Sequence, residues 1–301
     1  MRYRYLTADV FTTRRFGGNQ LAVVPDADGL TDGEMQQIAR EFNYSETVFI
    51  LPSRDASSLC RLRIFTPDEE LPFAGHPTIG AAFILTRIGR VDLISGSALI
   101  QFDEDAGPVS VEIEVRENAP FRATLTTPRL PEHRSSLLAN AELARLLGLS
   151  PDDLLGGDFN PEAVSCGLPF LIVPLRSRAA VSQIHLDLEF WRTSLATTWA
   201  PLLSIFSFET DSPADLHVRV LCPGLGMPED PATGSAAAAL GGYLAARNPL
   251  AAGTLHWTIE QGIEMGRPSL IEVAVDKIDG RVGAVRVGGS AVSVMAGEIE
   301  V

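Results

Sequence analysis

Two stretches of the chain repeat one structural pattern. Residues 63–82 and residues 219–239 each contain an alternating strand, a loop with proline and glycine, and a glycine that opens a helix of small and apolar residues. The helix-opening glycines, Gly75 and Gly234, are 159 positions apart. A duplicated domain whose loops end at two helix N-termini can bind a small anion between two lobes. The repeat therefore predicts a two-lobed chain with a ligand cleft.

The charge of the chain excludes several functional classes. The formal net charge is −14, which argues against nucleic acid as a partner, because such binding depends on clustered Lys and Arg. Lys277 is the only lysine, and it lies in a turn-like sequence. A pyridoxal phosphate enzyme needs a Schiff-base lysine and a P-loop needs a lysine in GxxxxGK[ST], so both chemistries are disfavoured.

Composition and targeting signals indicate a cytoplasmic globular protein. The length of 301 residues suits two domains, and 46% hydrophobic with 21% charged residues is typical of globular chains. The N-terminus leads directly into a strand-like run without a signal-peptide pattern, and no apolar run is long enough to span a bilayer. The three cysteines are too scattered for a disulfide framework or a CxxC site.

Periodicity predicts more strands than helices in both halves. Among the strands of the first half, the capping box from Thr31 to Glu34 predicts the start of a helix. The pattern breaks around residues 118–120, so we predict an N-terminal lobe over residues 1–119 and a C-terminal lobe over residues 120–290. The helices after the repeated glycines are apolar on all sides and must be buried on all sides. Each lobe is therefore predicted to be a sheet curled around a central helix.

The two helix openings are candidate anion sites. In Gly75-His76-Pro77 and in Gly234-Ser235, backbone N–H groups point out of the helix end, where the dipole favours a negative charge. A tight loop with no ligand is the alternative at each one. Two such openings in one chain favour a shared site for an anion.

Three side chains are candidates for proton chemistry. His76 is the only one of five histidines at a helix opening, and no histidine pair has metal-ligand spacing, so no metal is predicted. Asp230 precedes a proline near the second opening; it is either a turn former or the partner of His76 in a hydrogen bond across the cleft. Glu46, at the start of an apolar strand, is either an exposed strand end or a partly buried general acid/base. Its counterpart in the second half is predicted in residues 167–170, which carry no acid.

Taken together, the motifs resemble the phenazine-biosynthesis isomerase (PhzF-like) family, which has the diaminopimelate-epimerase-type fold. The resemblance spans nearly the whole chain and rests on five ordered motifs. These are residues 16–24, 45–47, 71–80, 229–235 and 261–269. It implies an α+β fold of two pseudo-symmetric lobes, each a barrel-like, mostly antiparallel sheet around a central helix. It also implies that residues 291–301 return to the first lobe.

The resemblance implies roles for particular residues. Glu46 resembles the acid/base of the family, and His76 and Asp230 its supporting pair. The residues that resemble those holding the substrate, and its carboxylate above all, are Ser45, Gly75, Gly234 and Ser235. The resemblance implies no metal and no organic cofactor. It also implies that the protein forms a homodimer. Racemases of this fold use two thiols at the helix openings, which His76 and Ser235 fill here, so the sequence disfavours that chemistry.

Three functions remain open on these residues. The first is a cofactor-independent isomerase in which Glu46 moves a proton on a small, carboxylate-bearing, cyclic unsaturated amino acid, similar to trans-2,3-dihydro-3-hydroxyanthranilate isomerase of phenazine biosynthesis. The second is an amino-acid epimerase with two bases, one from each lobe. The third is a non-catalytic binding protein that retains the cleft. Deuterium transfer from solvent and its stereochemistry distinguish the three.

Overall fold

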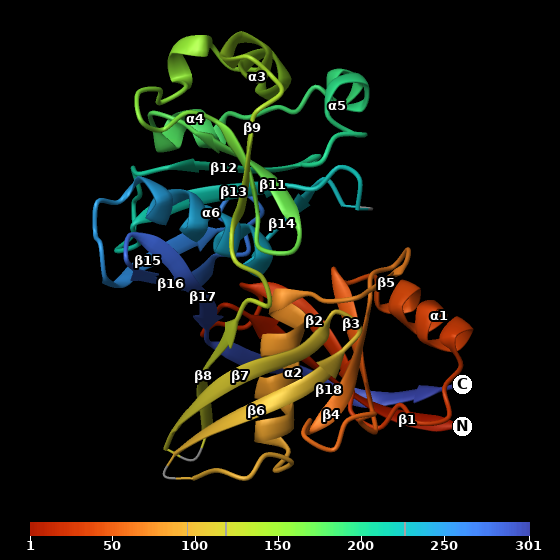
Figure 1. Ribbon diagram of the computed structural model, residues 1–301. Helices are drawn as coiled ribbons and strands as arrows, with labels where there is room; N and C mark the ends of the chain where they lie inside the picture. Colours follow the sequence, from red (N-terminus) through yellow and green to blue (C-terminus); the bar gives the residue numbers. More distant parts are fainter. Residues whose placement is uncertain (95, 118, 226) are drawn as a thin grey trace. The chain divides into compact units, whose positions relative to one another are not determined.

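The computed structural model of the chain describes residues 1–94, 96–117, 119–225 and 227–301. The chain forms two compact units (Figure 1). Unit 1 consists of Met1–Pro128 and Val287–Val301, and unit 2 consists of Arg129–Arg286. No helix in these described ranges is long and apolar enough to cross a membrane.

Strands dominate both units, and the α+β class is confirmed. Unit 1 contains β1 (Arg2–Val10), β2 (Asn19–Val24), α1 (Asp32–Phe42), β3 (Glu46–Leu51), β4 (Cys60–Phe65), β5 (Glu70–Leu71), α2 (Gly75–Arg87), β6 (Ser97–Glu104), β7 (Gly107–Arg116), β8 (Ala119–Thr126) and β18 (Ala291–Glu300). Unit 2 contains β9 (Glu132–Ser135), α3 (Asn140–Leu147), the 3₁₀ helix η1 (Pro151–Asp153), β10 (Glu162–Ser165), β11 (Pro169–Pro174), α4 (Arg178–Ser182), α5 (Leu188–Ser194), β12 (Leu202–Ser207), β13 (Leu216–Leu221), β14 (Glu229–Asp230), α6 (Gly234–Arg247), β15 (Gly253–Gln261) and β16 (Ser269–Ile278). The strand β17 (Arg281–Gly289) begins in unit 2 and ends in unit 1.

The sheet of unit 1 follows the order β18-β1-β2-β3-β4-β6-β7-β8. The β2–β3 and β4–β6 pairs are parallel and the others are antiparallel, while the short β5 pairs with β4. The helix between β2 and β3 begins at the predicted capping box, in which Thr31 Oγ1 accepts from the Glu34 N–H. Sequence periodicity thus identified this helix and its first residue correctly.

The sheet of unit 2 has the same strand order and the same pattern of parallel and antiparallel pairs. Its order is β9-β10-β11-β12-β13-β15-β16, again with β14 attached to β13. The β11–β12 and β13–β15 pairs are parallel, at the places where unit 1 has its parallel pairs. The internal repeat therefore extends from β1 to β7 in unit 1 and from β10 to β16 in unit 2.

The central helices occupy equivalent places in the two units. In α2 every residue from Gly75 to Thr86 is buried, and α6 is buried along most of its length. Glycines in these helices allow the sheet to approach: a Cβ on Gly80 would lie 2.3 Å from a methyl group of Leu21, and one on Gly241 would lie 2.5 Å from Val273. Small residues are thus required where helix and sheet are in contact. The prediction of a sheet around a buried helix in each lobe is confirmed.

The division between the units lies after residue 128 rather than after the predicted residue 119. The reason is that β8 pairs antiparallel with β7, with Val111 opposite Leu125, so these residues complete the first sheet. The first unit resumes at Val287 rather than at residue 291, because the end of β17 pairs with β8. Residue 118, where the sequence pattern breaks, lies outside the described residues.

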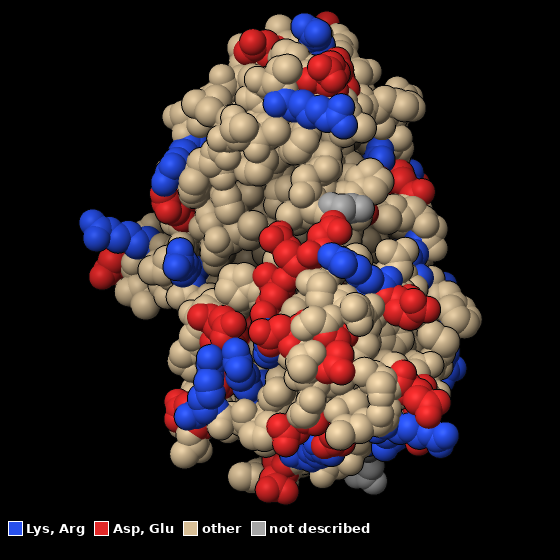
Figure 2. Space-filling view, turned by 90° about the vertical axis from the view of Figure 1, so that its right-hand side faces the viewer, with Lys and Arg blue, Asp and Glu red and all other residues tan. Residues whose placement is uncertain are grey.

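Charged side chains of both signs are mixed on the surface. On the face drawn in Figure 2, Lys and Arg side chains lie among Asp and Glu side chains without forming a continuous basic area. This distribution agrees with the net charge of −14.

Candidate active site

Three elements of unit 1 bring polar side chains together at one end of α2. Glu46 is the first residue of β3, Asn19 the first residue of β2, and His76 the second residue of α2. His76 Nε2 lies 3.3 Å from Glu46 Oε2, and His76 Nδ1 lies 3.3 Å from Asn19 Nδ2. The side chain of His76 is 5% exposed and that of Glu46 is 15% exposed. The carboxylate thus lies at the edge of solvent with the imidazole behind it.

The loop before β2 explains why a glycine is needed near Asn19. Gly18 has a positive φ of +62°, and a Cβ there would lie 2.3 Å from the carbonyl oxygen of Val10. Only glycine fits such a close approach in this conformation. Asn19 Oδ1 then accepts a hydrogen bond of 2.9 Å from the Ser45 hydroxyl, which fixes the orientation of the amide. The motif at residues 16–24 therefore positions Asn19 against His76.

His76 is held in its uncharged form. Burial lowers the pKa of His76 to about 3, and the backbone of Gln20 opposes this only in part. If Nδ1 accepts from the Asn19 amide, the single ring proton is on Nε2 and points to Glu46. The 3.3 Å contact therefore places a neutral imidazole against the carboxylate, without a full positive charge beside it.

A second carboxyl group lies buried near the start of α2. Glu104, the last residue of β6, is 2% exposed, and burial raises its pKa to about 8 despite the hydrogen bond with Thr78. Thr78 Oγ1 lies 2.7 Å from both the Ala74 carbonyl oxygen and Glu104 Oε1. The Thr78 hydroxyl thus offers its single proton to two acceptors, the Ala74 carbonyl oxygen and the Glu104 carboxyl group.

In unit 2 the loop before α6 is fixed by several hydrogen bonds. Asp230 is 7% exposed and accepts a hydrogen bond from the hydroxyl of Thr233. The side-chain amide of Gln261 donates to the Asp230 carbonyl oxygen over 2.7 Å and accepts from the Thr233 N–H over 3.2 Å. The Ser269 hydroxyl donates to the carbonyl oxygen of Pro231 over 3.0 Å. Asp230 is thus part of an ordered turn rather than a mobile loop.

The helix openings have the geometry that the sequence predicts. Gly75 and Gly234 are the first residues of α2 and α6, and both are buried. Ser235 is half-buried directly after Gly234. The first N–H groups of a helix have no partner within the helix, so each opening can donate hydrogen bonds to an anion.

The repeat identifies the counterpart of each unit 1 side chain in unit 2. Arg63 lies opposite Phe49, and Arg219 lies opposite Ile205, so Glu46 corresponds to Leu202 at the start of β12. The sequence-based assignment of this counterpart to residues 167–170 is wrong, because those residues end one turn and begin β11, the equivalent of β2. An apolar residue stands in unit 2 where unit 1 has its glutamate.

The three cysteines are not among the residues that form the helix openings. Cys60, Cys166 and Cys222 are all buried and free. Burial raises the pKa of Cys60 and of Cys166 to about 12, so neither is a thiolate at neutral pH. A buried thiol of this kind is unreactive. His76 and Ser235 occupy the helix openings, as the sequence indicates.

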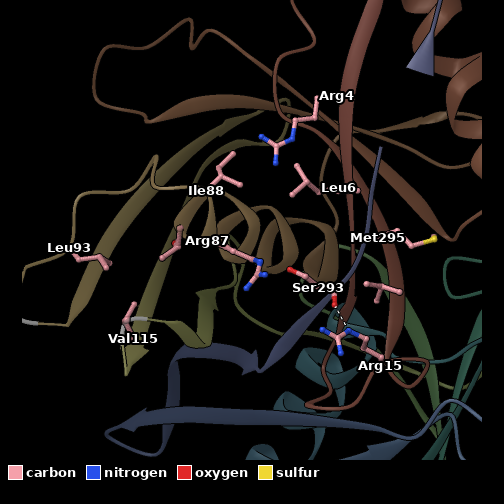
Figure 3. A pocket seen from close by; sticks show the side chains of 12 residues that line it. Arg4, Leu6, Arg15, Arg87, Ile88, Leu93, Val115, Ser293 and Met295 are labelled. Carbon is pink, nitrogen blue, oxygen red and sulfur yellow. Dashed lines mark hydrogen bonds between the residues drawn. The ribbon is translucent and has the colours of Figure 1, made fainter. Parts of the chain in front are cut away.

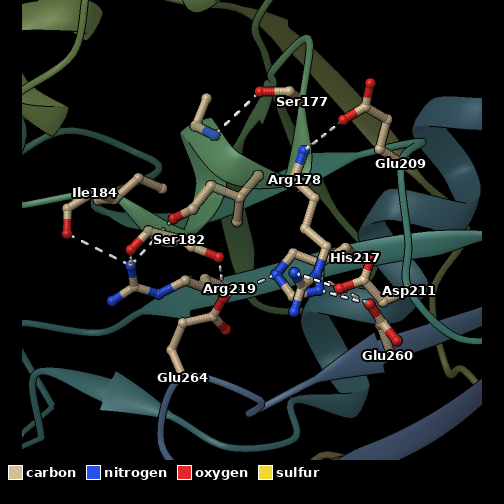
Figure 4. Close-up of polar contacts among 12 residues, drawn as sticks. Ser177, Arg178, Ser182, Ile184, Glu209, Asp211, His217, Arg219, Glu260 and Glu264 are labelled. Atoms are coloured by element: carbon tan, nitrogen blue, oxygen red, sulfur yellow. Dashed lines mark hydrogen bonds and ion pairs between the residues drawn. The ribbon is translucent and has the colours of Figure 1, made fainter.

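A further buried ionic cluster surrounds His217 in unit 2 (Figure 4). His217 has no exposed side-chain surface; its Nδ1 lies 2.8 Å from Glu260 Oε1 and its Nε2 lies 3.0 Å from Glu264 Oε1. The Ser182 hydroxyl donates to Glu264 over 2.7 Å. His217 is therefore packed between two carboxylates.

Both ring nitrogens of His217 face acceptors, so the ring is an imidazolium. Burial alone would lower the pKa of His217, but the hydrogen bonds and charges of Glu264 and Glu260 outweigh burial and raise it. In turn, burial would raise the pKa of Glu264, but His217 and Ser182 lower it to about 2. Glu260 is followed by Gln261, so the end of β15 connects this cluster to the turn that holds Asp230.

The structure places the predicted residues in two groups. Ser45, Glu46, Gly75 and His76 lie together in unit 1, and Asp230, Gly234 and Ser235 lie together in unit 2. Sequence reasoning missed Asn19 and Gln261 as individual residues, although both lie in motifs that carry the family resemblance. Within the described ranges, no group of three His, Cys, Asp or Glu side chains could hold a metal ion.

Comparison with known proteins assigns the family. The family model for phenazine biosynthesis-like proteins, PhzC-PhzF, matches residues 8–297. The chain belongs to this family. A protein from Mesorhizobium japonicum named as an uncharacterized isomerase is 39% identical, with 98% of each chain covered. A trans-2,3-dihydro-3-hydroxyanthranilate isomerase from Pseudomonas aeruginosa is 34% identical, with 96% of each chain covered.

Solved structures agree with this membership. A PhzF-family phenazine biosynthesis protein from Bacillus anthracis has a TM-score of 0.89 at 27% identity, with 100% of each chain covered. A hydroxyproline epimerase from Agrobacterium vitis has a TM-score of 0.63 at 13% identity, with 99% of this chain and 92% of that chain covered. The second likeness concerns the fold alone, and it confirms the predicted epimerase-type fold. The relatives named as isomerases support an isomerase-type enzyme.

Proposed function

We propose that the protein is a cofactor-independent isomerase that moves a proton within a small, carboxylate-bearing, cyclic unsaturated amino acid. The observation that carries the proposal is the contact between Glu46 and a buried, uncharged His76 at the open end of α2. The isomerase named in Pseudomonas aeruginosa acts on trans-2,3-dihydro-3-hydroxyanthranilate, and we propose a substrate of the same chemical class here.

In the proposed reaction, the Glu46 carboxylate removes a proton from one carbon of the substrate. The electron pair of the broken C–H bond moves into the adjacent unsaturated system, and the protonated Glu46 returns the proton to another carbon on the same face. Atoms and electrons are conserved, so the step needs no oxidant, reductant or second substrate. The product is the ketone tautomer once the resulting enol rearranges.

The other side chains have supporting roles in this proposal. Asn19 contacts His76, and His76 lies against the Glu46 carboxylate; we propose that these contacts limit the orientations of the carboxylate, which is a condition for efficient proton transfer. N–H groups at the helix openings, together with Ser45 and Ser235, are proposed to bind the substrate carboxylate and to stabilise developing negative charge. Asp230, held by Thr233, is proposed to act in the same reaction.

The apolar counterpart of Glu46 favours a one-base mechanism. An epimerase with one base from each lobe needs a second proton-transfer group in the other repeat, and unit 2 has Leu202 at that position. One carboxylate that removes and returns a proton on the same face needs no such group. The isomerase is therefore preferred to the two-base epimerase.

The test is proton NMR of the purified protein in D2O with dihydro-hydroxyanthranilate, comparing wild type with Glu46→Gln. We expect substrate consumption with deuterium at the receiving carbon, and a loss of at least about a hundredfold in kcat for the variant, since a positioned acid/base contributes that much or more. The matched control is Glu112→Gln on the exposed side of β7, which we expect to turn over at the wild-type rate.

Three results would contradict the proposal. Full activity of a folded Glu46→Gln variant would remove Glu46 as the acid/base. Carboxylate binding without deuterium exchange, for this substrate and a panel of small amino acids, would favour the binding protein. Deuterium entry with inversion of a stereocentre would instead favour the epimerase.

A further inference from the structure

A second cavity lies in unit 1 at the other end of α2 from Glu46. Its volume is about 740 Å³, within the range of small-molecule sites in proteins. The last turn of α2 forms its floor, and the exposed strand pair β1–β18 forms one wall (Figure 3). Arg87 follows His76 by eleven residues in the same helix, which corresponds to about 16 Å along the axis. The cavity is therefore separate from the candidate active site.

The wall of the cavity contains a β-bulge. The register of β1 and β18 shifts between Leu6, opposite Ala296, and Ala8, opposite Ser293. Four consecutive residues of β18, Ser293 to Ala296, line the cavity at this irregularity. Bulges are local features that redirect side chains, and they are frequent beside functional sites. The apolar part of the lining comes from Val294, Met295 and Ala296 together with Leu6, Ile88, Leu93 and Val115.

Three arginines from three different elements surround this apolar surface. Arg4 comes from β1, Arg15 from the loop after β1, and Arg87 from the end of α2 (Figure 3). Arg15 Nε donates to the Ser293 carbonyl oxygen over 2.9 Å, which fixes this side chain at the rim. The lining of the cavity contains no aspartate or glutamate.

These arginines have no carboxylate partner within the part of the chain that the structure describes. Glu298 is directly opposite Arg4 in β18, yet the two form no ion pair there. In a chain of net charge −14, three cations around one cavity without an acidic residue are unexpected. The helix dipole favours a cation at the end of α2, which accounts for Arg87 but not for Arg4 or Arg15.

We propose that this cavity binds an organic anion with an apolar body and two or more negative charges, on carboxylate or phosphate groups. Guanidinium groups pair with both kinds of oxyanion through two parallel hydrogen bonds, and the apolar wall accommodates the body of the ligand. The proposal concerns a second site and does not depend on the reaction at Glu46.

The experiment is titration of the full-length protein with two probes, benzenetricarboxylate and naphthyl phosphate, at low ionic strength. The readout is the NMR signal of carbon-13-labelled methionine methyl groups, because Met295 lines the cavity and the other four methionines serve as internal controls. We expect a saturable shift of the Met295 signal, assigned with a Met295→Leu variant. Binding of one probe only identifies whether the site takes carboxylate or phosphate.

The matched variants are Arg4→Gln/Arg87→Gln and, as a control of equal charge change in unit 2, Arg192→Gln/Arg281→Gln, which replaces exposed arginines. We expect the first pair to weaken binding at least tenfold and the second pair to leave it within twofold. Neutral naphthol is expected to bind more weakly than naphthyl phosphate. No saturable binding of either probe to the wild type, or equal affinity in the Arg4→Gln/Arg87→Gln variant, would overturn the proposal.

Discussion

The repeated strands have the same order in the two units, and each unit contains an equivalent arginine–glutamate ion pair. The other buried polar side chains differ between the units. Arg63 on β4 binds Glu70 on β5 through Nε and Nη2, and Arg219 on β13 binds Glu229 on β14 through the same two atoms. Each pair joins the last long strand before the central helix to the short strand that follows. The shared pair belongs to the scaffold that both repeats need.

The positions that differ are those next to the central helices. Glu46 in unit 1 corresponds to Leu202 in unit 2, and the residue after the helix-opening glycine is His76 in one and Ser235 in the other. The duplicated backbone thus presents a helix opening in each unit, while the glutamate at the start of the strand before the shared arginine strand is present in unit 1 only. A fold of this kind can change its chemistry through a few side chains and keep its sheet intact.

A third difference concerns a cationic side chain on the strand that carries the equivalent arginine, β4 in unit 1 and β13 in unit 2. Arg61 in unit 1 corresponds to His217 in unit 2, because each lies two residues before the shared arginine. The Arg61 side chain is 21% exposed and pairs with Asp105, whereas His217 is fully buried between Glu260 and Glu264. We therefore expect His217 to contribute more than Arg61 to the stability of its unit.

The largest effect is expected from His217→Leu. The substitution leaves Glu264 without the His217 cation and Glu260 with its 3.9 Å contact to Arg178, and breaking such a buried pair costs about 3–5 kcal/mol. We expect the free energy of unfolding of unit 2 to fall by that amount. Urea denaturation followed by tryptophan fluorescence measures it, because Trp191, Trp199 and Trp257 all lie in unit 2.

The matched control is His133→Leu. His133 also contacts a glutamate, Glu162, over 3.3 Å, but its side chain is 29% exposed, so the loss should be below about 1 kcal/mol. Adding Glu264→Gln to His217→Leu should restore part of the lost stability. Equal losses for His217→Leu and His133→Leu would show that the buried cluster does not stabilise unit 2.

The next largest effect on stability is expected when Glu104 of unit 1 is replaced by the residue at the equivalent position of unit 2, Gln261. Glu104 and Gln261 are equivalent, since each ends the strand after its central helix and fixes the start of that helix. A protonated carboxyl group, like an amide, has both a donor and an acceptor, so protonated Glu104 is similar to Gln261. Burial raises the pKa of Glu104 to about 8, above its ordinary 4.5, so the folded state holds a proton that the unfolded state has lost.

This difference makes the wild type less stable as pH rises from 4.5 to 8, because the contribution of a raised pKa is lost in that window. Glu104→Gln removes the dependence. We expect the variant to gain up to about 3 kcal/mol over the wild type between pH 4.5 and pH 7, at about 1.4 kcal/mol per pH unit. Urea denaturation followed by circular dichroism gives the pH profile.

The reciprocal variant Gln261→Glu is the control for this swap. It should become progressively less stable than the wild type as pH rises, because a carboxylate cannot donate to the Asp230 carbonyl oxygen as the amide does. If the Glu104→Gln and wild-type profiles ran parallel over this range, Glu104 would be ionised in the folded state.

Sequence reasoning predicted the repeat and the central helices, but not the details of their contacts, and the role of Glu46 as an acid/base stays a prediction. Apolar helices after two glycines predict burial directly, so α2 and α6 were identified correctly. By contrast, the proximity of Glu46 and His76 and the burial of His217 depend on strand register. A register shift of one residue moves every side chain to the other face, so neither contact follows from local sequence alone.

The smallest effect contrasts the two buried histidines through their pH dependence. Burial lowers the pKa of His76 to about 3, so below pH 6.5 the unfolded state binds a proton that the folded state does not. The wild type therefore loses stability as pH falls from 6.5. We expect His76→Gln to gain about 2 kcal/mol relative to the wild type between pH 6.5 and pH 5.

His217→Gln should show the opposite trend, which is the internal control. The pKa of His217 is raised, so its contribution is fully present below pH 6.5 and is lost as pH rises through the raised value. Relative to the wild type, this variant should be least stable at low pH and recover as pH rises. Equal trends for the two variants would mean that Glu46 charges His76 as Glu260 and Glu264 charge His217. The proposed acid/base Glu46 would then form an ion pair with an imidazolium, rather than lie beside a neutral ring.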